Sequence, residues 1–219
     1  MQRLLHIRHT VFVLVAVAFC LIVSACASPR NTPSLPPVNL GVAWFTQPAQ
    51  TAELLAGFLP ANTDRVTSKN LLSLDMELAD TLRAQTKREY SFSTEFSQCA
   101  DVTVPGRTSS SRGAALHYWT AVGKCMKVDY LIVPQIILMK ERDGSDIGAV
   151  SPSSVIMETF LIDVRENRLA GRSHFDETQA ALSANLLDTD KFISRGGRWI
   201  TALELAREGM NKAVVELGL

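Results

Sequence analysis

A short apolar run covers residues 11–23 and ends three positions before Cys26. Arg3 and Arg8 give the segment in front of it a positive charge. A helix that crosses a bilayer needs about 20 apolar residues, so this run is short for a membrane span. A positive start, a short apolar core and small residues before a cleavage point are typical of a secretory signal peptide. The sequence therefore predicts a signal peptide at residues 1–25 and a domain that folds outside the cytoplasm.

The four residues Val23-Ser24-Ala25-Cys26 match the site at which bacterial lipoproteins are modified. A diacylglycerol group is attached to the cysteine thiol, the signal peptide is cut off before it, and the new amino group can take a further chain such as palmitate. Each buried methylene contributes roughly 0.8 kcal/mol to membrane binding, so several chains anchor a protein stably. The alternative is an uncleaved anchor. Ala27 stands where an aspartate would retain enteric lipoproteins at the inner membrane, which favours the inner leaflet of the outer membrane, facing the periplasm.

Residues 26–37 combine the lipidated Cys26 with prolines and short polar residues, which predicts an extended tether. Extended proline-rich chain advances about 3.1 Å per residue, so this tether would hold a domain on the order of 30 Å from the membrane. The domain itself is expected to occupy residues 38–219, because no second linker interrupts them.

Strand-like and helix-like segments alternate along residues 38–219 and predict a single α/β domain. Strands are expected at residues 38–45, 90–96, 131–139, 155–164 and 169–179, and helices at 66–87, 114–126 and 201–217. The last helix opens on a capping box, Thr201 to Glu204. The order β-α-β-α-β-β-β-α allows parallel crossovers in the first half and hairpins in the second. We therefore expect a mixed β-sheet with helices packed on it.

Residues 131–139 are the most apolar stretch after the signal peptide and are expected to form the central strand. Pro134 lies inside this stretch. Proline cannot donate to a strand ladder and usually marks a bulge or an edge strand. The sequence therefore predicts a bulge or an edge at this position.

The four cysteines have separate expected fates. Cys20 is removed with the signal peptide and Cys26 carries the lipid. Cys99 and Cys125 remain in an oxidising compartment, where disulfides persist, so we predict a Cys99–Cys125 bond, with two buried thiols as the alternative. Two cysteines without a nearby pair of histidines make no zinc site. No metal or cofactor is expected.

The total charge argues against a nucleic-acid partner. Lysine plus arginine and aspartate plus glutamate both number 22, and removal of the signal peptide leaves a small acidic excess. Nucleic-acid-binding domains usually carry a basic patch or stripe, and the sequence has none.

Candidate catalytic and ligand-binding motifs are incomplete. His174 and Asp176 would share one strand face and could act as base and acid, but no G-x-S-x-G nucleophile motif accompanies them. The loop 106–113 resembles a phosphate-binding loop but lacks its lysine followed by serine or threonine. Residues 143–146 place carboxylates in a turn without the late glutamate of a calcium loop. We therefore predict no catalytic residues and no enzyme.

The remaining candidate binding segment is Gly196-Gly197-Arg198-Trp199. Two glycines permit unusual backbone angles, and arginine and tryptophan are common at binding hot spots. Arg198 and Trp199 are therefore candidate contacts with a partner protein. The alternative is a turn whose tryptophan packs under the last helix.

Three stretches carry a resemblance to a known family. Asp129–Val133 leads from a helix into an apolar strand, Phe160–Val164 precedes a turn, and Phe175–Thr178 lies beyond it. With the cysteine motif and the order of elements, they resemble the periplasmic lipoproteins whose domain is similar to the N-terminal domain of TolB. Activators of penicillin-binding proteins of the LpoB kind and the curli-secretion lipoprotein CsgG share that architecture.

The resemblance covers roughly residues 38–217, with departures. Pro134-Gln135 stands where a glycine is usual, and Gly171 or Arg172 where an aromatic residue is often found. Only Cys26 is therefore carried over as a functional residue.

The resemblance implies a non-enzymatic envelope protein that docks on another envelope protein. The first hypothesis is thus a lipid-anchored docking or assembly module for envelope or cell-wall machinery. The alternative is a homo-oligomer, a self-assembling secretion pore or structural lipoprotein of the CsgG type. Membrane strands of such a pore need about 9–11 alternating residues, and the candidate segments 49–64 and 109–113 are not suitable. A hydrolase that uses His174 and Asp176 is the third hypothesis.

Overall fold

The computed structural model describes residues 35–36, 38–61, 63–95, 97–99, 112–179 and 189–219. The chain divides into two units, Met1–Pro33 and Ser34–Leu219, and all described residues belong to the second. The expected signal peptide, Cys26, most of the tether and most of the loop 106–113 lie outside the described residues.

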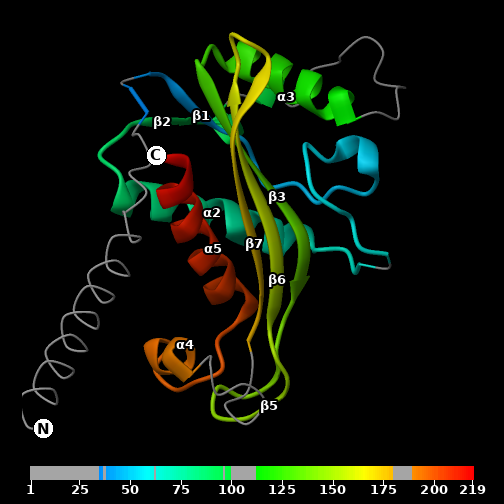
Figure 1. Cartoon of the computed structure of the whole chain (residues 1–219), viewed down its shortest axis with the longest axis vertical. Coiled ribbons are helices and arrows are strands. Elements are labelled where there is room, and N and C mark those ends of the chain that lie inside the picture. Colours follow the sequence, from blue (N-terminus) through cyan, green and yellow to red (C-terminus); the bar gives the residue numbers. More distant parts are fainter. Residues whose placement is uncertain (1–34, 37, 62, 96, 100–111, 180–188) are drawn as a thin grey trace, which may run out of the picture. The chain divides into compact units, whose positions relative to one another are not determined.

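A five-stranded mixed sheet forms the centre of the domain, in the order β2-β1-β3-β6-β7 (Figure 1). Its strands are β1 (Leu40–Val42), β2 (Tyr90–Phe92), β3 (Tyr130–Lys140), β6 (Ser154–Asp163) and β7 (Arg168–Thr178). β1 is parallel to β2 and to β3, whereas β3, β6 and β7 form an antiparallel meander. The prediction of a mixed sheet, with crossovers first and hairpins second, is confirmed.

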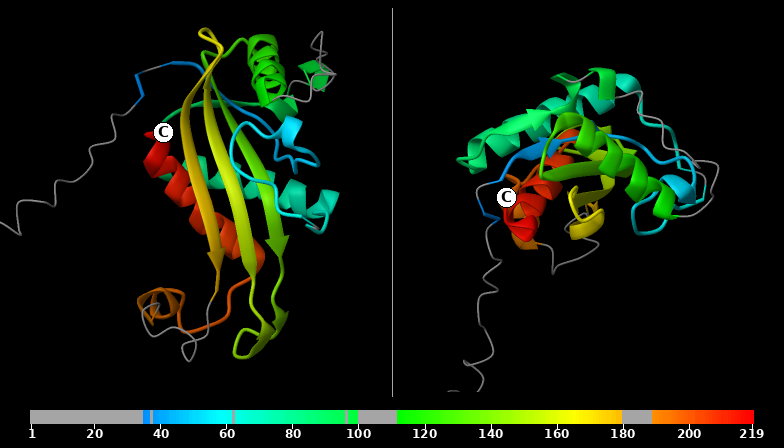
Figure 2. Two further views of the ribbon diagram at one scale, coloured as in Figure 1. Left: turned by 45° about the vertical axis from the view of Figure 1, so that its right-hand side comes forward. Right: turned by 90° about the horizontal axis from the view of Figure 1, so that it is seen from above.

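Three long helices pack on this sheet: α2 (Ser68–Gln85), α3 (Arg112–Met126) and α5 (Ala202–Leu217). Side chains alternate along β3, so Ile132 joins a core cluster with α2 and α5, whereas Leu131 and Val133 join a cluster with α3. The two clusters place α2 and α5 on one face of the sheet and α3 on the other (Figure 2). This two-sided cover explains why the central strand is apolar at successive positions.

The first two strands are shorter than the apolar pattern predicts. β1 ends at Val42, and the N–H of Phe45 bonds to the side chain of Asp75 at 2.6 Å instead of to a strand. Val42 is the last residue of β1 that pairs with β2, so β2 ends at its partner Phe92. The chain then forms two short 3-10 turns, η2 (Ser93–Glu95) and η3 (Ser97–Cys99).

β3 is the middle strand of the sheet, as expected, and Pro134 lies within it rather than at an edge. Ile136, two residues further on, donates its N–H to the carbonyl of Thr46. The backbone nitrogens of Pro134 and Ile136 therefore both point toward the β1 side of β3, because alternate residues of a strand point the same way. The nitrogen of Pro134 therefore points to where regular pairing with β1 has already ended, and no bond to β6 is lost. A bulge does occur in the ladder to β6, between Ile136 and Leu138.

The last helix begins and ends as its sequence predicts. The hydroxyl of Thr201 accepts the N–H of Glu204, and the Glu204 carboxylate accepts the N–H of Thr201, which completes the capping box. Gly218 follows the helix in the left-handed region, with φ at 66°, a conformation that glycine adopts without steric cost.

Shorter elements complete the domain. A hairpin of β4 (Asp143–Gly144) and β5 (Ala149–Ser151) extends from the sheet between β3 and β6, and the short helix α4 (Thr189–Ser194) precedes the segment that leads into α5. Residues 49–61 and 63–64 contain one 3-10 turn, η1 (Thr51–Glu53), and no strand.

Candidate docking surface

Arg198 and Trp199 lie at the end of the sheet where β6 begins and β7 ends. The next residue, Ile200, donates its N–H to the Gln179 side chain at 2.8 Å, and its carbonyl accepts the Ser153 hydroxyl at 2.9 Å. Both bonds are buried. The chain is therefore fixed to the end of the sheet just after the two candidate residues.

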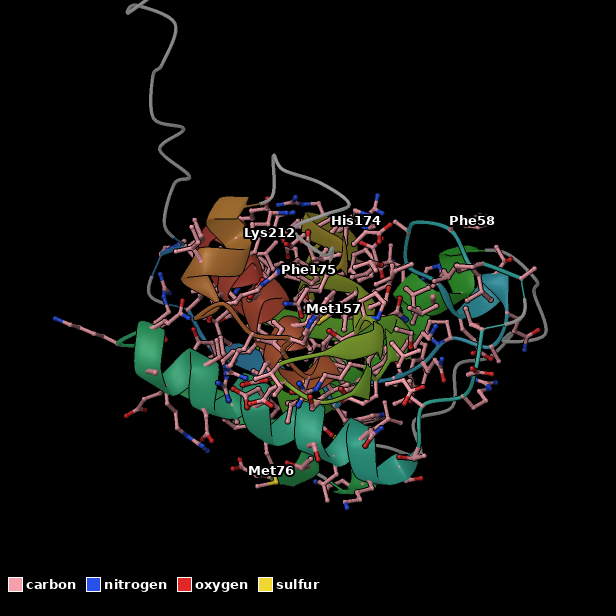
Figure 3. The ribbon with its side chains drawn as sticks, turned by 90° about the horizontal axis from the view of Figure 1, so that it is seen from below. Phe58, Met76, Met157, His174, Phe175 and Lys212 are labelled. Carbon is pink, nitrogen blue, oxygen red and sulfur yellow. A yellow bond between two sulfur atoms is a disulfide. The ribbon has the colours of Figure 1, made fainter. Side chains whose placement is uncertain are left out.

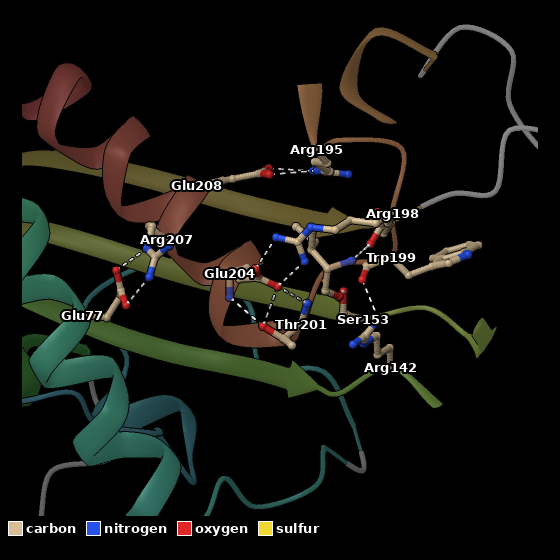
Figure 4. Close-up of polar contacts among 12 residues, drawn as sticks. Glu77, Arg142, Ser153, Arg195, Arg198, Trp199, Thr201, Glu204, Arg207 and Glu208 are labelled. Atoms are coloured by element: carbon tan, nitrogen blue, oxygen red, sulfur yellow. Dashed lines mark hydrogen bonds and ion pairs between the residues drawn. The ribbon is translucent and has the colours of Figure 1, made fainter. Parts of the chain in front are cut away.

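The backbone of Trp199 is bound to the β4–β5 hairpin. Its N–H donates to the carbonyl of Asp146 at 2.7 Å, and its carbonyl accepts a guanidinium N–H of Arg142 at 2.6 Å. The indole is half-buried and extends away from α5 rather than lying beneath it (Figure 4). The position of Trp199 is therefore set by its backbone, while part of its ring faces solvent.

Arg198 bonds to the start of α5. Its guanidinium donates two hydrogen bonds to the carboxylate of Glu204, at 2.6 and 3.3 Å, and the capping box of Thr201 uses the same carboxylate (Figure 4). The Arg198 hydrogen bond is the main reason that the pKa of Glu204 falls to about 2. Arg198 therefore has a local role in the domain, which its sequence context does not reveal.

Three exposed aliphatic side chains lie on the two elements that flank the Trp199 segment, the β4–β5 hairpin bonded to its backbone and α4 just before it in the chain. Ile147 and Val150 of the β4–β5 hairpin are 90% and 86% exposed, and Ile193 of α4 is 66% exposed. We call Ile147, Val150, Ile193 and Trp199 the far-end surface. Figure 1 shows α4 and β5 at one end of the sheet, with β2 and the C-terminus toward the other. The sequence does not single out the three aliphatic residues, because isolated apolar residues in polar segments carry no periodic signal.

Ion pairs fix α4 beside the sheet. Arg195 is nearly buried and donates to Glu208 of α5 at 2.6 and 2.8 Å, and also to Glu177 of β7 at 3.4 Å. Lys191 bonds to the same Glu177 at 2.9 Å. These contacts hold Ile193 in a defined position relative to β7 and α5.

His174 bonds to Glu158 and not to Asp176. Its Nδ1 lies 2.8 Å from the carboxylate of Glu158, a buried residue of β6 that also accepts two bonds from Arg172 at 2.6 and 2.9 Å. No described hydroxyl or thiol is hydrogen-bonded to His174. His174 therefore belongs to a hydrogen-bond network with Glu158 and Arg172. Its partner Glu158 could have been suspected, because it interrupts an apolar strand.

The other motifs take structural positions. Asp143 belongs to β4, and the N–H of Ser145 closes the hairpin turn on the carbonyl of Gly148 at 2.9 Å. Within the described residues, no cluster of three or more His, Cys, Asp or Glu side chains could hold a metal ion. None of the helices in the described part of the chain has the length and apolarity of a membrane span.

Cys99 and Cys125 are joined by a disulfide bond. Cys99 ends η3 and is fully buried in the core beneath α3, and Cys125 lies in the last turn of that helix. The bond therefore links the end of the η2–η3 segment to the start of the chain that leads into β3.

The described chain begins at the opposite end of the sheet from the far-end surface. The N–H of Leu35 donates to the carbonyl of Gly218 at 3.2 Å, and the guanidinium of Arg88 donates to the carbonyls of Leu35 and Pro36. These contacts lie near the first residues of β1 and β2. β6 contains 10 residues, and a strand rises about 3.3 Å per residue, so the two ends are separated by about 30 Å.

Comparison with known proteins gives distant structural matches only. Models of known protein families and curated protein sequences yield no match. Among solved structures, the PelC dodecamer from Paraburkholderia phytofirmans is 14% identical, with a TM-score of 0.45, over 84% of this chain and 93% of that chain. The lipoprotein GNA1162 from Neisseria meningitidis is 10% identical, with a TM-score of 0.35, over 74% of this chain and 99% of that chain. The hypothetical protein CT253 from Chlamydia trachomatis is 12% identical, with a TM-score of 0.34, over 80% and 96% of the two chains.

Proposed function

We propose that this protein is a lipid-anchored docking module of the bacterial envelope, without enzymatic activity, that binds another envelope protein through the far-end surface. The observation that carries the proposal is the set of exposed apolar side chains on the two elements that flank the Trp199 segment. Exposed apolar patches on soluble domains mark interaction sites more often than scattered single residues do. Tryptophan is among the residues that dominate binding energy at interfaces.

The rigidity of the far-end surface supports this role. The hairpin, the Trp199 segment and α4 are each bonded to neighbouring elements, through Arg142, Gln179 and Arg195. A surface that is ordered before binding loses less conformational entropy when a partner binds, and that raises affinity.

The place where the described chain begins, at Leu35, also supports it. In the proposal, Cys26 carries the lipid in the inner leaflet of the outer membrane, and the tether joins the domain at Leu35. The far-end surface lies about 30 Å along the sheet from this point, so it can present itself to a periplasmic protein while the lipid stays in the membrane. Anchoring raises the effective concentration of the surface for partners held near the same membrane.

The first experiment tests the anchor and the partner together. The tagged full-length protein is recovered from solubilised envelopes, intact mass reports lipid on Cys26, and co-purifying proteins are identified. We expect one envelope protein, such as a cell-wall synthase, as the main partner. Cys26→Ala should abolish lipidation and release the protein from the membrane fraction.

A variant pair then tests the surface against the purified partner. The double variant Ile147→Ser, Trp199→Ala should weaken binding at least about tenfold, which corresponds to 1.4 kcal/mol. Val215→Ser, on an exposed position of α5 away from this surface, is the matched control and should bind normally. Equal binding by the double variant and the control would refute the far-end surface. Recovery of only the protein itself, at high mass, would instead support the alternative of a self-assembled homo-oligomer.

A further inference from the structure

A groove separates α2 from the carboxyl ends of β1 and β2. Its volume is 330 Å³, and its walls come from α2, from the residues that follow β1, and from the end of β2 with η2. In open α/β sheets, ligands commonly bind outside the carboxyl ends of the parallel strands. The groove is small for a folded domain and is in the range for a few side chains of a peptide or for a small molecule. We call it the α2 groove.

The rim of the α2 groove carries apolar side chains that the core does not need. α2 buries Leu74 and Leu78 against the sheet, yet Leu72 and Met76, one helical turn apart, are 58% and 63% exposed. Met76 projects outward from α2 (Figure 3). Leu72, Met76 and Trp44 all line the groove and give it an apolar wall.

Two polar groups in the groove have unused hydrogen-bonding capacity. Ser93 is 2% exposed, and its hydroxyl has no hydrogen-bond partner among the described residues. A buried polar atom without a partner costs free energy, so it calls for an explanation. Asp75 accepts the N–H of Phe45 through Oδ1, and no described donor bonds to its other oxygen.

The charges around the α2 groove are mainly negative. Asp75, Asp80 and Glu95 line it together with a single cation, Arg83. Arg83 is already used, because it pairs with Asp80 at 3.1 Å and stacks over the ring of Phe92 at 5.4 Å. The carboxylates of Asp75 and Glu95 therefore have no cationic partner among the described residues, and a ligand with a positive charge would complement them.

We propose that the α2 groove is a second docking site, which takes a short apolar segment of a partner protein that carries a lysine or an arginine. The apolar side chains of that segment pack against Leu72 and Met76. Its cation pairs with the free oxygen of Asp75 and with Glu95, and its backbone or side-chain polar groups reach the hydroxyl of Ser93. The groove and the far-end surface share no residue, so each proposal can fail without the other.

A peptide selection tests the chemistry directly. The full-length protein in phosphatidylcholine nanodiscs is presented to a phage library of random heptapeptides, in parallel with the variants Asp75→Asn, Met76→Ser and Val215→Ser. Asn keeps an acceptor for the Phe45 N–H, and Met76 and Val215 are both exposed helix positions, so all three variants should fold, which circular dichroism verifies. We expect wild type and Val215→Ser to enrich the same apolar peptides with a lysine or arginine.

Affinity measurements on the most enriched peptide complete the test. By fluorescence anisotropy, Asp75→Asn and Met76→Ser should each weaken binding by about tenfold, whereas Val215→Ser should not. Replacing the basic residue of the peptide with glutamine should weaken binding to wild type by a similar factor and should have little effect on binding to Asp75→Asn. Enriched peptides that lack a basic residue, or no enrichment that depends on the groove, would overturn the proposal. So would sedimentation data in which Met76→Ser converts a homo-oligomer to a monomer, because the occupant would then be a second copy.

Discussion

Gly123 of α3 lies where the helix approaches the turn that follows β6. A methyl group added at Gly123 would lie 2.5 Å from one γ-carbon of Val164, 3.3 Å from the other, and 3.5 Å from its Cβ. Carbon atoms in favourable contact are about 3.5–4.0 Å apart. The Val164 side chain is short, β-branched and buried, so it cannot swing away as a longer side chain could. Gly123→Ala therefore forces a shift between α3 and the sheet.

The expected free-energy change has two opposing parts. Extra methyl groups in a packed core cost about 1–3 kcal/mol. Alanine in place of glycine inside a helix returns about 1 kcal/mol. Gly123→Ala should therefore lower the free energy of unfolding by about 1 kcal/mol. In a Val164→Ala background both γ-carbons are gone and only the ordinary 3.5 Å contact remains, so the same substitution should raise stability by about 1 kcal/mol.

The assay is urea unfolding of the four proteins in this double-mutant cycle, followed by circular dichroism in one detergent. Linear extrapolation gives each free energy of unfolding, provided that the urea dependence stays the same across the set. The coupling between the two sites should be about 2 kcal/mol, within the range for residues in contact. Ala84→Gly, at an exposed position of α2, measures the helix-propensity part alone. If Gly123→Ala has the same sign in both backgrounds, the contact with Val164 does not limit the packing of α3.

Three further predictions concern single residues. Burial raises the pKa of Asp75 to about 6, above its ordinary 3.8, although the Phe45 N–H favours the charged form. Between about pH 4 and 6 the folded protein therefore holds a proton that the unfolded chain has lost. The free energy of unfolding should fall as pH rises from about 4 to 6. Asp75→Asn should flatten that fall, and an unchanged slope would show that another group causes it. Thr201→Ala removes the N-cap of α5 and should cost about 1 kcal/mol in urea unfolding, whereas Thr201→Ser should cost little. Reduction of the Cys99–Cys125 bond should add two hydrogens to the intact mass, and an unchanged mass would mean that the thiols are free. Reduction should also lower the free energy of unfolding by about 3 kcal/mol, because it opens a loop with a sequence separation of 26.

Most of the fold could be predicted from the sequence, because the sequence patterns that specify its helices and central strand are local. The helix expected at residues 66–87, the capping box of α5 and the apolar run of β3 each depend on residues within one element, and each is confirmed in the structure. The ends of β1 and β2 were less accessible. Beyond Val42 the backbone bonds to distant residues, with the N–H of Phe45 on Asp75 of α2 and the N–H of Thr46 on Pro134 of β3, and no local pattern shows such partners.

The candidate site was less accessible for the same reason. Arg198 and Trp199 are adjacent in sequence, but their surroundings come from other parts of the chain, through Glu204 and the hairpin carbonyl of Asp146. A sequence pattern can show that Arg198 is charged, but it cannot show that Glu204 already neutralises it. Glu158 and His174 likewise meet only because β6 and β7 pair in one register.

The use of charge differs between the two proposed surfaces, and this difference makes them separable. At the far end, Arg142, Arg195 and Arg198 all bond to acceptors inside the domain, and the four side chains of the far-end surface are apolar or aromatic. Binding there should depend on burial of apolar surface and change little with salt. In the α2 groove, Asp75 and Glu95 would pair with a cation at a partly exposed site. Salt weakens such an attraction, because the Debye length falls from about 10 Å at 0.1 M to about 3 Å at 1 M. Raising the salt concentration over that range should therefore weaken binding of the basic peptide to the α2 groove and leave partner binding at the far-end surface almost unchanged. Equal salt dependence at both sites would contradict this difference in the use of charge.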